Sequence, residues 1–235
     1  MRLVMWVICV TPLGVFCLMT YTVGHIGLKA LGGPLLLYIA TVLLGLLIHG
    51  AIVLPLILFL FTRKNPFRFM YQMRRALLTA FGTDSSSATL PVTIETAESE
   101  GGCSKRSANF VLPLGATINM DGTAIYLGVC AMFIGNAIGQ PLSFSQQLTV
   151  IITATLASIG TAGVPGAGAI MLLMVLESIG LKVTEGSAVA AAYAMILGID
   201  ALLDMGRTCI NVTGDMAGTA IIAKTEKELD LAKWK

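Results

Sequence analysis

Residues 115–125 read GATINMDGTAI and place an asparagine, an aspartate and two glycines inside an otherwise apolar part of the chain. The 235 residues are 56% hydrophobic and only 12% charged, whereas a soluble domain carries about 25% charged residues. Two stretches, residues 3–26 and 31–61, contain no Asp, Glu, Lys or Arg, and a spanning helix needs roughly 20 predominantly apolar residues. We therefore predict an all-α, multi-pass membrane protein in which residues 115–125 lie at membrane depth.

The distribution of charge predicts which ends of these helices face the cytoplasm. Residues 63–75, RKNPFRFMYQMRR, hold five basic residues and no acid, and the positive-inside rule places such a short loop in the cytoplasm. The tail at residues 224–235, KTEKELDLAKWK, is polar and rich in lysine, so we expect the C-terminus there as well. The stretch 3–26 exceeds the roughly 7–15 apolar residues of a secretory signal, so we interpret it as a transmembrane helix.

The second half of the chain contains two similar units. The apolar pattern is interrupted by GTDSSSATLP at residues 82–91 and by GTAGVPGAGA at residues 160–169. Each interruption is followed by a similar six-residue motif, which is MDGTAI at residues 120–125 and MAGTAI at residues 216–221. Irregular backbone at membrane depth persists only where it is buried in protein or lines a wet cavity. Paired interrupted segments of this kind point to the binding site of a secondary transporter.

Polar residues follow a helical period within residues 193–223, YAMILGIDALLDMGRTCINVTGDMAGTAIIA. At about 100° per residue, five of them fall within a sector of about 80°. These five are Asp200, Asp204, Arg207, Asn211 and Asp215. Three acids and one base leave excess negative charge where each charge costs roughly 3 kcal/mol, so we expect a bound cation. A buried ion pair that only fixes helix packing remains an alternative.

The expected cation is small and hard. Asn119, Asp121, Asn211 and Asp215 offer oxygen ligands, and the neighbouring glycines can free backbone carbonyls, as in other oxygen-only sites. Soft ligands are missing from this set, which argues against a transition metal. The five cysteines show no metal-binding spacing, so we interpret them as structural rather than as a zinc site or a disulfide framework.

Arg207 and Asp204 together indicate the chemistry of a substrate. The planar guanidinium of Arg207 suits a substrate carboxylate, and the Asp204 carboxylate, one turn earlier, suits a substrate ammonium group. The pair therefore matches the groups of an acidic amino acid. An internal Arg207–Asp204 pair without a ligand is the alternative. The serines at 85–87 could cradle a carboxylate near a helix N-terminus, although serines are also ordinary turn residues.

Hydrolysis is not expected from this sequence. A GxSxG motif is absent, and the only histidines, His25 and His49, lie in the first two apolar stretches. We interpret both histidines as packed or interfacial side chains rather than as proton carriers. The chain is therefore expected not to be an enzyme.

Four motifs carry a resemblance to a known family. They are SSSATLPVT (85–93), GATINMDGTA (115–124), ASIGTAGVPGAGAIM (157–171) and DMGRTCINVTGD (204–215). In this order they resemble the C-terminal half of the dicarboxylate/amino acid:cation symporter family, which includes the excitatory amino acid transporters. The resemblance implies two spans in residues 1–62, as partial scaffold and start of the transport domain. It implies a transport-domain core in residues 63–235, made of a first re-entrant helical hairpin, an unwound helix, a second re-entrant hairpin and a polar last helix, in an inverted repeat.

The resemblance also implies the positions of the binding residues. A substrate site is implied at Ser86, Thr123, Val164, Gly168, Asp204, Arg207, Thr208 and Asn211. Sodium ligands are implied in three groups: Gly115, Asn119, Asn211 and Asp215; Asn119 with Asp121; and the carbonyls around Thr117, Ser158, Ile159 and Thr161. Two positions depart from the family pattern, because Asp84 replaces an arginine or serine and Met205 replaces an arginine of the animal members.

The implied function is sodium-coupled symport of glutamate or aspartate into the cell, by an elevator motion within a homotrimer in the lipid bilayer. Sodium ions would be the coupling ions, and neither an organic cofactor nor a nucleic acid partner is expected. One alternative is a C4-dicarboxylate symporter coupled to sodium or protons, and another is an ion channel. A third is a fragment without solitary transport, because about four N-terminal spans of the family are missing from this sequence.

Overall fold

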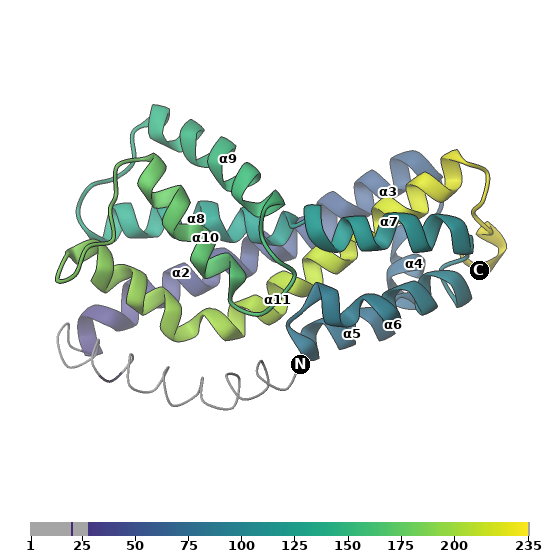
Figure 1. Ribbon diagram of the computed structural model, residues 1–235, viewed down its shortest axis with the longest axis horizontal. Coiled ribbons are helices and arrows are strands. Elements are labelled where there is room, and N and C mark those ends of the chain that lie inside the picture. The colour runs from purple at the N-terminus through teal and green to yellow at the C-terminus, as the bar shows by residue number, and fades with distance from the viewer. Residues whose placement is uncertain (1–19, 21–27, 235) are drawn as a thin grey trace.

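The protein is described by a computed structural model that covers residue 20 and residues 28–234, and this part of the chain is almost entirely helical (Figure 1). The predicted span at residues 3–26 lies outside the described residues, apart from Thr20. The elements in chain order are α2 (Leu28–Ile48), the π-helix η1 (His49–Val53), α3 (Leu54–Thr62), α4 (Pro66–Gln72), α5 (Arg74–Thr83), α6 (Ser86–Ser99), α7 (Lys105–Ile118), α8 (Asp121–Ala137), α9 (Phe144–Ile159), α10 (Ala167–Ser178), α11 (Ala188–Thr225) and the 3₁₀ turn η2 (Leu231–Trp234).

Three helical stretches among the described residues are long and apolar enough to cross a membrane. They are Gly33–Thr62, Lys105–Ala137 and Ala188–Thr225. The first confirms the span predicted at residues 31–61. Large apolar side chains such as Leu37 (70% exposed) and Leu47 (63% exposed) point away from the core, which suits contact with lipid.

The first of these helices widens in its middle. Pro55 lacks an N–H group, and its ring would clash with the carbonyl four residues earlier in a regular α-helix. The chain relieves this clash with η1, in which the Leu54 N–H donates to the His49 carbonyl five residues back. Such π segments are rare and frequently lie at functional sites, and this one begins with His49.

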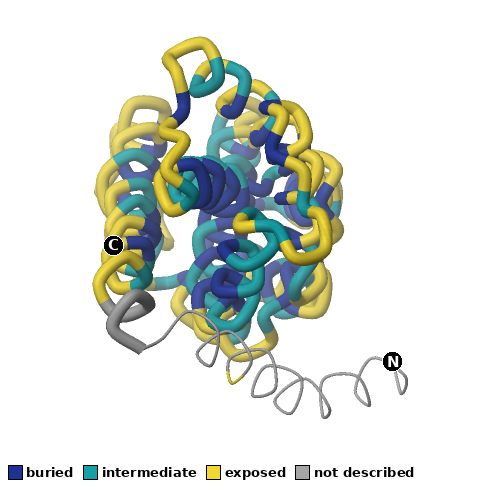
Figure 2. The backbone as a smooth tube through the Cα atoms, turned by 90° about the vertical axis from the view of Figure 1, so that its left-hand side faces the viewer, coloured by how far each residue is buried: buried dark blue, intermediate teal, exposed yellow. Residues whose placement is uncertain are grey.

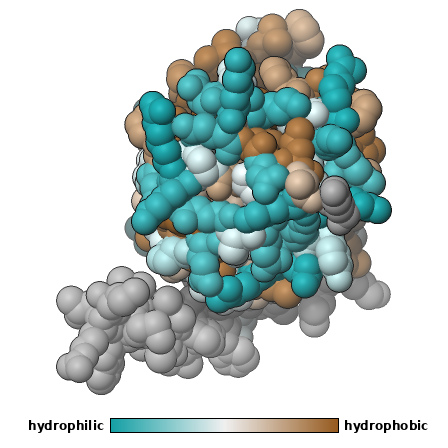
Figure 3. All heavy atoms as spheres, turned by 90° about the vertical axis from the view of Figure 1, so that its right-hand side faces the viewer, coloured by the Kyte–Doolittle hydropathy of each residue, from teal (hydrophilic) through white to brown (hydrophobic). Residues whose placement is uncertain are grey.

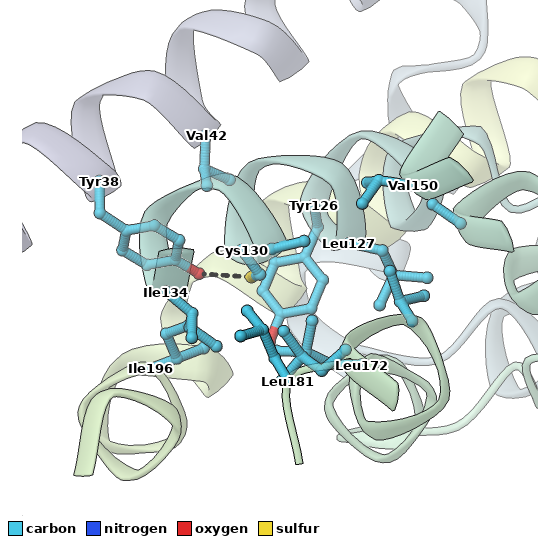
Figure 4. Close-up of a cluster of buried hydrophobic side chains, with 14 of the residues drawn as sticks. Tyr38, Val42, Tyr126, Leu127, Cys130, Ile134, Val150, Leu172, Leu181 and Ile196 are labelled. Atoms are coloured by element: carbon cyan, nitrogen blue, oxygen red, sulfur yellow. Dashed lines mark hydrogen bonds between the residues drawn. The ribbon is translucent and has the colours of Figure 1, made fainter. Parts of the chain in front are cut away.

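The long helix α11 runs through the molecule (Figure 1), and its two halves contribute buried residues to two separate core clusters. At one end α2, α8, α9 and α10 enclose a cluster in which the Tyr38 hydroxyl and the Cys130 thiol are 3.3 Å apart (Figure 4). At the other end α3 to α7 enclose a cluster that includes Phe69 and Met73. Seen end-on, the buried backbone lies in the centre and the exposed backbone around it (Figure 2).

The C-terminal tail folds back over the ends of α4, α6 and α7. The Trp234 ring packs on Phe69 at a centroid distance of 4.6 Å, and its indole N–H donates to the Gly101 carbonyl at 2.7 Å. Ser104 and Ser107 donate hydrogen bonds to the Glu228 carboxylate at 2.5 and 2.7 Å. This end of the molecule is largely hydrophilic (Figure 3), as expected for a surface outside the membrane.

The Glu228 contacts predict that the tail is released by acid. The hydrogen bonds from Ser104 and then Ser107 lower the pKa of Glu228 below its usual value near 4.5. Because the folded pKa is depressed, the contribution of Glu228 to stability is present above about pH 4.5 and is lost as the pH falls through the folded pKa. In a Trp6→Phe background, the fluorescence of Trp234 should therefore shift to the red in acid.

The Glu228→Gln variant should show the same red shift already at neutral pH, because the amide is a weaker acceptor than the carboxylate. Glu226→Gln removes a carboxylate two residues away and should behave as wild type. Identical spectra for the two variants at neutral pH would rule out this role of Glu228.

Candidate functional site

The stretch quoted at the outset forms a break between two helices. Asn119 (φ −102°, ψ 78°) and Met120 (φ −110°, ψ 55°) leave the helical region, so α7 ends and α8 begins within residues 118–121. The N–H groups of Gly122 and Thr123 at the start of α8 donate to the Asn211 side-chain oxygen at 2.8 and 3.4 Å. This geometry confirms the predicted interruption and shows that α11 supplies the cap.

The polar face predicted for α11 is confirmed, because all five of its members are buried. Arg207 is 1% exposed, and its guanidinium donates to Asp204 at 2.9 Å and to Asp200 at 3.3 Å. The Tyr126 ring lies 3.8 Å from the guanidinium carbon. The internal Arg207–Asp204 pair, left open by the sequence, is therefore the arrangement that this structure shows, with Asp200 as a second partner.

The two interrupted segments, residues 82–91 and residues 160–169, meet each other at the same place. The Ser85 hydroxyl donates to the Gly163 carbonyl at 2.6 Å, and the Ser87 N–H donates to the same carbonyl at 3.2 Å. The Gly166 N–H donates to the second carboxylate oxygen of Asp204 at 2.8 Å. The α5–α6 turn, the α9–α10 loop and α11 are thus joined by hydrogen bonds.

A small cavity of about 10 Å³ lies between these segments. That volume has room for about one water molecule, so an amino acid could enter only after a movement of the surrounding chain. Its walls are formed by Ser86, Met120, Thr123, Thr161, Ala162, Gly163, Val164, Gly168, Asp204, Thr208 and Asn211. These include every expected substrate residue except Arg207, which lies behind Asp204 and against Gly168, where an added Cβ would be 3.1 Å from the guanidinium carbon.

A second group of polar side chains surrounds Gly214 on α11. The Asn119 amide donates to Asp215 at 3.0 Å, and an added Cβ at Gly115 would lie 2.5 Å from an Asp215 carboxylate oxygen. An added Cβ at Gly214 would lie 2.6 Å from the Asn119 amide nitrogen and 2.8 Å from an Asp121 oxygen. The structure therefore brings together Gly115, Asn119, Asp121 and Asp215, all of which are expected ion ligands.

The remaining expected ion ligands are less closely associated. Thr117 is exposed, and its hydroxyl bonds to the Leu114 carbonyl. Ser158 and Thr161 are buried, but each hydroxyl bonds to a carbonyl of α9, while Ile159 is 46% exposed. Within residues 28–234, hydrogen bonds connect none of these four side chains to another of the four.

Sequence reasoning missed two residues of this region. His49 was interpreted as a packed or interfacial side chain, yet its Nε2 atom lies 2.8 Å from Asp121. Asp84, noted only as a departure from the family, accepts a hydrogen bond from Thr208 at 3.2 Å. Pro55 was a local sequence signal of an irregular turn near His49, but the partner of His49, 72 residues away, was not predictable from spacing.

Together these features define a multi-pass helical membrane protein with a buried, charged centre built around broken helices. Comparison with known sequences matches residues 1–225 to the model of the sodium:dicarboxylate symporter family. The chain therefore belongs to the sodium:dicarboxylate symporter family.

Individual relatives agree with this assignment. The chain is 47% identical to excitatory amino acid transporter 3 of Mus musculus over 98% of its own length and 43% of the relative. It is 49% identical to an excitatory amino acid transporter of Caenorhabditis elegans over 94% of its length and 43% of that relative. For excitatory amino acid transporter 1 of Bos taurus the identity is 46% over 94% of the chain and 40% of the relative. The chain thus spans about two fifths of the length of these relatives.

The packing around Gly214 predicts a steep penalty for a single methyl group. Gly214→Ala should lower the stability of the purified chain by about 1–3 kcal/mol, because Asn119 and Asp121 must move. Gly218→Ala is the matched control on the same helix, where an added Cβ meets nothing within 4 Å, and it should be neutral or stabilising by up to about 1 kcal/mol. Thermal denaturation in detergent measures both, and equal effects would contradict the described packing.

Proposed function

We propose that this chain forms the ion- and substrate-binding part of a sodium-coupled symporter for acidic amino acids, glutamate or aspartate. The observation that carries the proposal is the buried Arg207, held by two aspartates beside a helix break that gathers further carboxylates and carboxamides. The family and the names of the relatives support it. Because the chain spans about two fifths of those relatives, transport by the whole protein belongs to the proposal.

In this proposal sodium ions bind at the groups around the helix break. Gly115, Asn119, Asn211 and Asp215 form one site, and Asn119 with Asp121 forms another. The contacts among Gly115, Asn119, Asp121 and Asp215 support these assignments, since carboxylate, carboxamide and carbonyl oxygens are the ligands that hard cations prefer. A third site uses Thr117, Ser158, Ile159 and Thr161, where the freed carbonyls near the end of α9 would be the ligands.

The substrate carboxylate is assigned to Arg207, and this assignment requires a rearrangement. In the present structure the guanidinium already has Asp200 and Asp204 as partners. The substrate carboxylate, which would be a third, can reach Arg207 only if the α9–α10 loop moves and the Gly166–Asp204 hydrogen bond breaks. The loop would then act as a lid, which also opens the cavity of about 10 Å³ to an amino acid.

The wider architecture of the proposal follows the family. The α5–α6 and α9–α10 pairs are proposed as re-entrant hairpins of an inverted repeat, which carry the substrate by an elevator motion in a homotrimer. Residues 63–75 and the C-terminus are proposed to face the cytoplasm, in agreement with their basic character. Sodium is the coupling ion in this proposal.

A C4-dicarboxylate is the second candidate substrate. Asp204, the proposed partner of the substrate amine, is fully engaged by Arg207 and Gly166 in this structure. A dicarboxylate needs no amine partner and could leave one of these contacts in place. The two substrates therefore differ in how far Asp204 has to change its partners.

Uptake of radiolabelled substrate tests the proposal. Proteoliposomes that contain the purified chain should concentrate aspartate when an inward sodium gradient is applied, and should not do so in choline. Asp215→Asn should lower the uptake at least tenfold, because loss of an orienting ligand typically weakens metal binding about 10–100-fold. Glu177→Gln removes an exposed carboxylate from α10 and should leave the uptake unchanged.

Three results would contradict the proposal in different ways. Concentration of succinate but not of aspartate would assign the dicarboxylate function. Aspartate flux that only follows its own gradient and ignores sodium would indicate a channel. If proteoliposomes that contain the folded chain show no flux of aspartate or succinate, the chain does not transport by itself.

A further inference from the structure

A hollow on the described molecule lies away from the charged centre, where α3 turns into α4. It has a volume of about 580 Å³, within the range of roughly 300–1,000 Å³ that is typical of ligand sites. Its walls are formed by Ala51, Ile52, Pro55, Leu56, Phe59, Arg63, Lys64, Asn65, Pro66 and Phe67. Leu56 (53% exposed) and Phe67 (58% exposed) leave much of the apolar wall uncovered.

Two basic side chains, Arg63 and Lys64, lie at one end of this groove. Arg63 ends α3 in the left-handed conformation (φ 56°), and Lys64 follows it at the surface. Within residues 28–234 neither side chain takes part in a hydrogen bond or an ion pair. By contrast, Arg75 in the same basic loop is paired with Glu95 at 2.9 Å. The groove thus combines an apolar channel with two uncompensated positive charges.

The groove lies at the C-terminal end of a candidate membrane-spanning helix. It begins beside the last turns of the span Gly33–Thr62 and ends at the basic loop that follows. Basic residues at the end of a spanning helix attract anionic lipid headgroups, each by roughly fivefold in affinity. We propose that this groove is a binding site for one anionic phospholipid, with the headgroup at Arg63 and Lys64 and an acyl chain along Ile52, Leu56 and Phe59.

The charge pattern argues against two other occupants. In a two-fold symmetric contact, a second copy of this chain would bring the same two cations to the interface, without an acid to neutralise them. Residues 1–27 are also unsuitable, because they contain no acidic residue. An anionic lipid supplies both the missing negative charge and the apolar chain.

Native mass spectrometry of the purified chain tests the site. The protein in neutral detergent is titrated with phosphatidylglycerol and, separately, with phosphatidylcholine of the same chain length. Wild type should prefer phosphatidylglycerol. The double variant Arg63→Gln/Lys64→Gln should lose on the order of 25-fold in phosphatidylglycerol affinity, about fivefold for each charge, and little in phosphatidylcholine affinity.

A matched control separates the groove from general surface charge. Arg68→Gln/Arg74→Gln removes the same net charge from exposed residues that do not line the groove, and should keep the wild-type preference. Leu56→Trp narrows the apolar wall at an exposed position and should weaken both lipids. Circular dichroism confirms that each variant is folded.

Equal binding of the two lipids by wild type would overturn the proposal. Equal losses of phosphatidylglycerol affinity in the two double variants would also overturn it, because they would show a general attraction to surface charge rather than binding at one site. A dimer that disappears in Arg63→Gln/Lys64→Gln would assign the groove to a second copy instead.

Discussion

Burial of the Arg207 guanidinium is the constraint on which the rest of the structure depends. A guanidinium stays charged in proteins, and an unpaired charge in the interior costs several kcal/mol. The chain meets this cost with Asp200 and Asp204 on the same helix and with the face of Tyr126 on α8. Gly168 lets α10 approach within contact of the guanidinium. One side chain thus sets the mutual positions of α8, α10 and α11.

The need to give buried charges polar partners also explains the group of carboxylates around Gly214. Asp121 and Asp215 come from different helices and lie near each other around Gly214, where the Asn119 amide and the His49 ring supply polar partners. His49 belongs to the first described span, so its contact ties α2 and α3 to the helix break. The π segment that Pro55 forces on this span begins with His49. Pro55 and His49, which are close in sequence, therefore act together in a contact with Asp121, 72 residues after His49.

Much of this arrangement could be predicted because it depends on local periodicity. The face shared by Asp200 and Asp215 follows from helical geometry, and the break at Asn119 follows from glycines and polar residues in apolar surroundings. The His49–Asp121 contact could not be predicted, since it depends on how two helices pack. The partners of Arg207 also stayed open, because an internal ion pair and a ligand-binding arginine have the same sequence pattern. Only the packing shows that Arg207 lies behind Asp204.

The central claim is that the carboxylates around the helix break form a sodium site, and the most direct test is the thermal stability of the purified chain. Sodium chloride and choline chloride are compared at equal ionic strength, for wild type and for Asp215→Asn. A ligand at 100 times its dissociation constant stabilises the folded state by about 2.7 kcal/mol. The account predicts a higher melting temperature in sodium than in choline for wild type, and a smaller difference between the two salts for Asp215→Asn, because this variant lacks a ligand of one proposed sodium site. Equal melting temperatures of wild type in the two salts would contradict it.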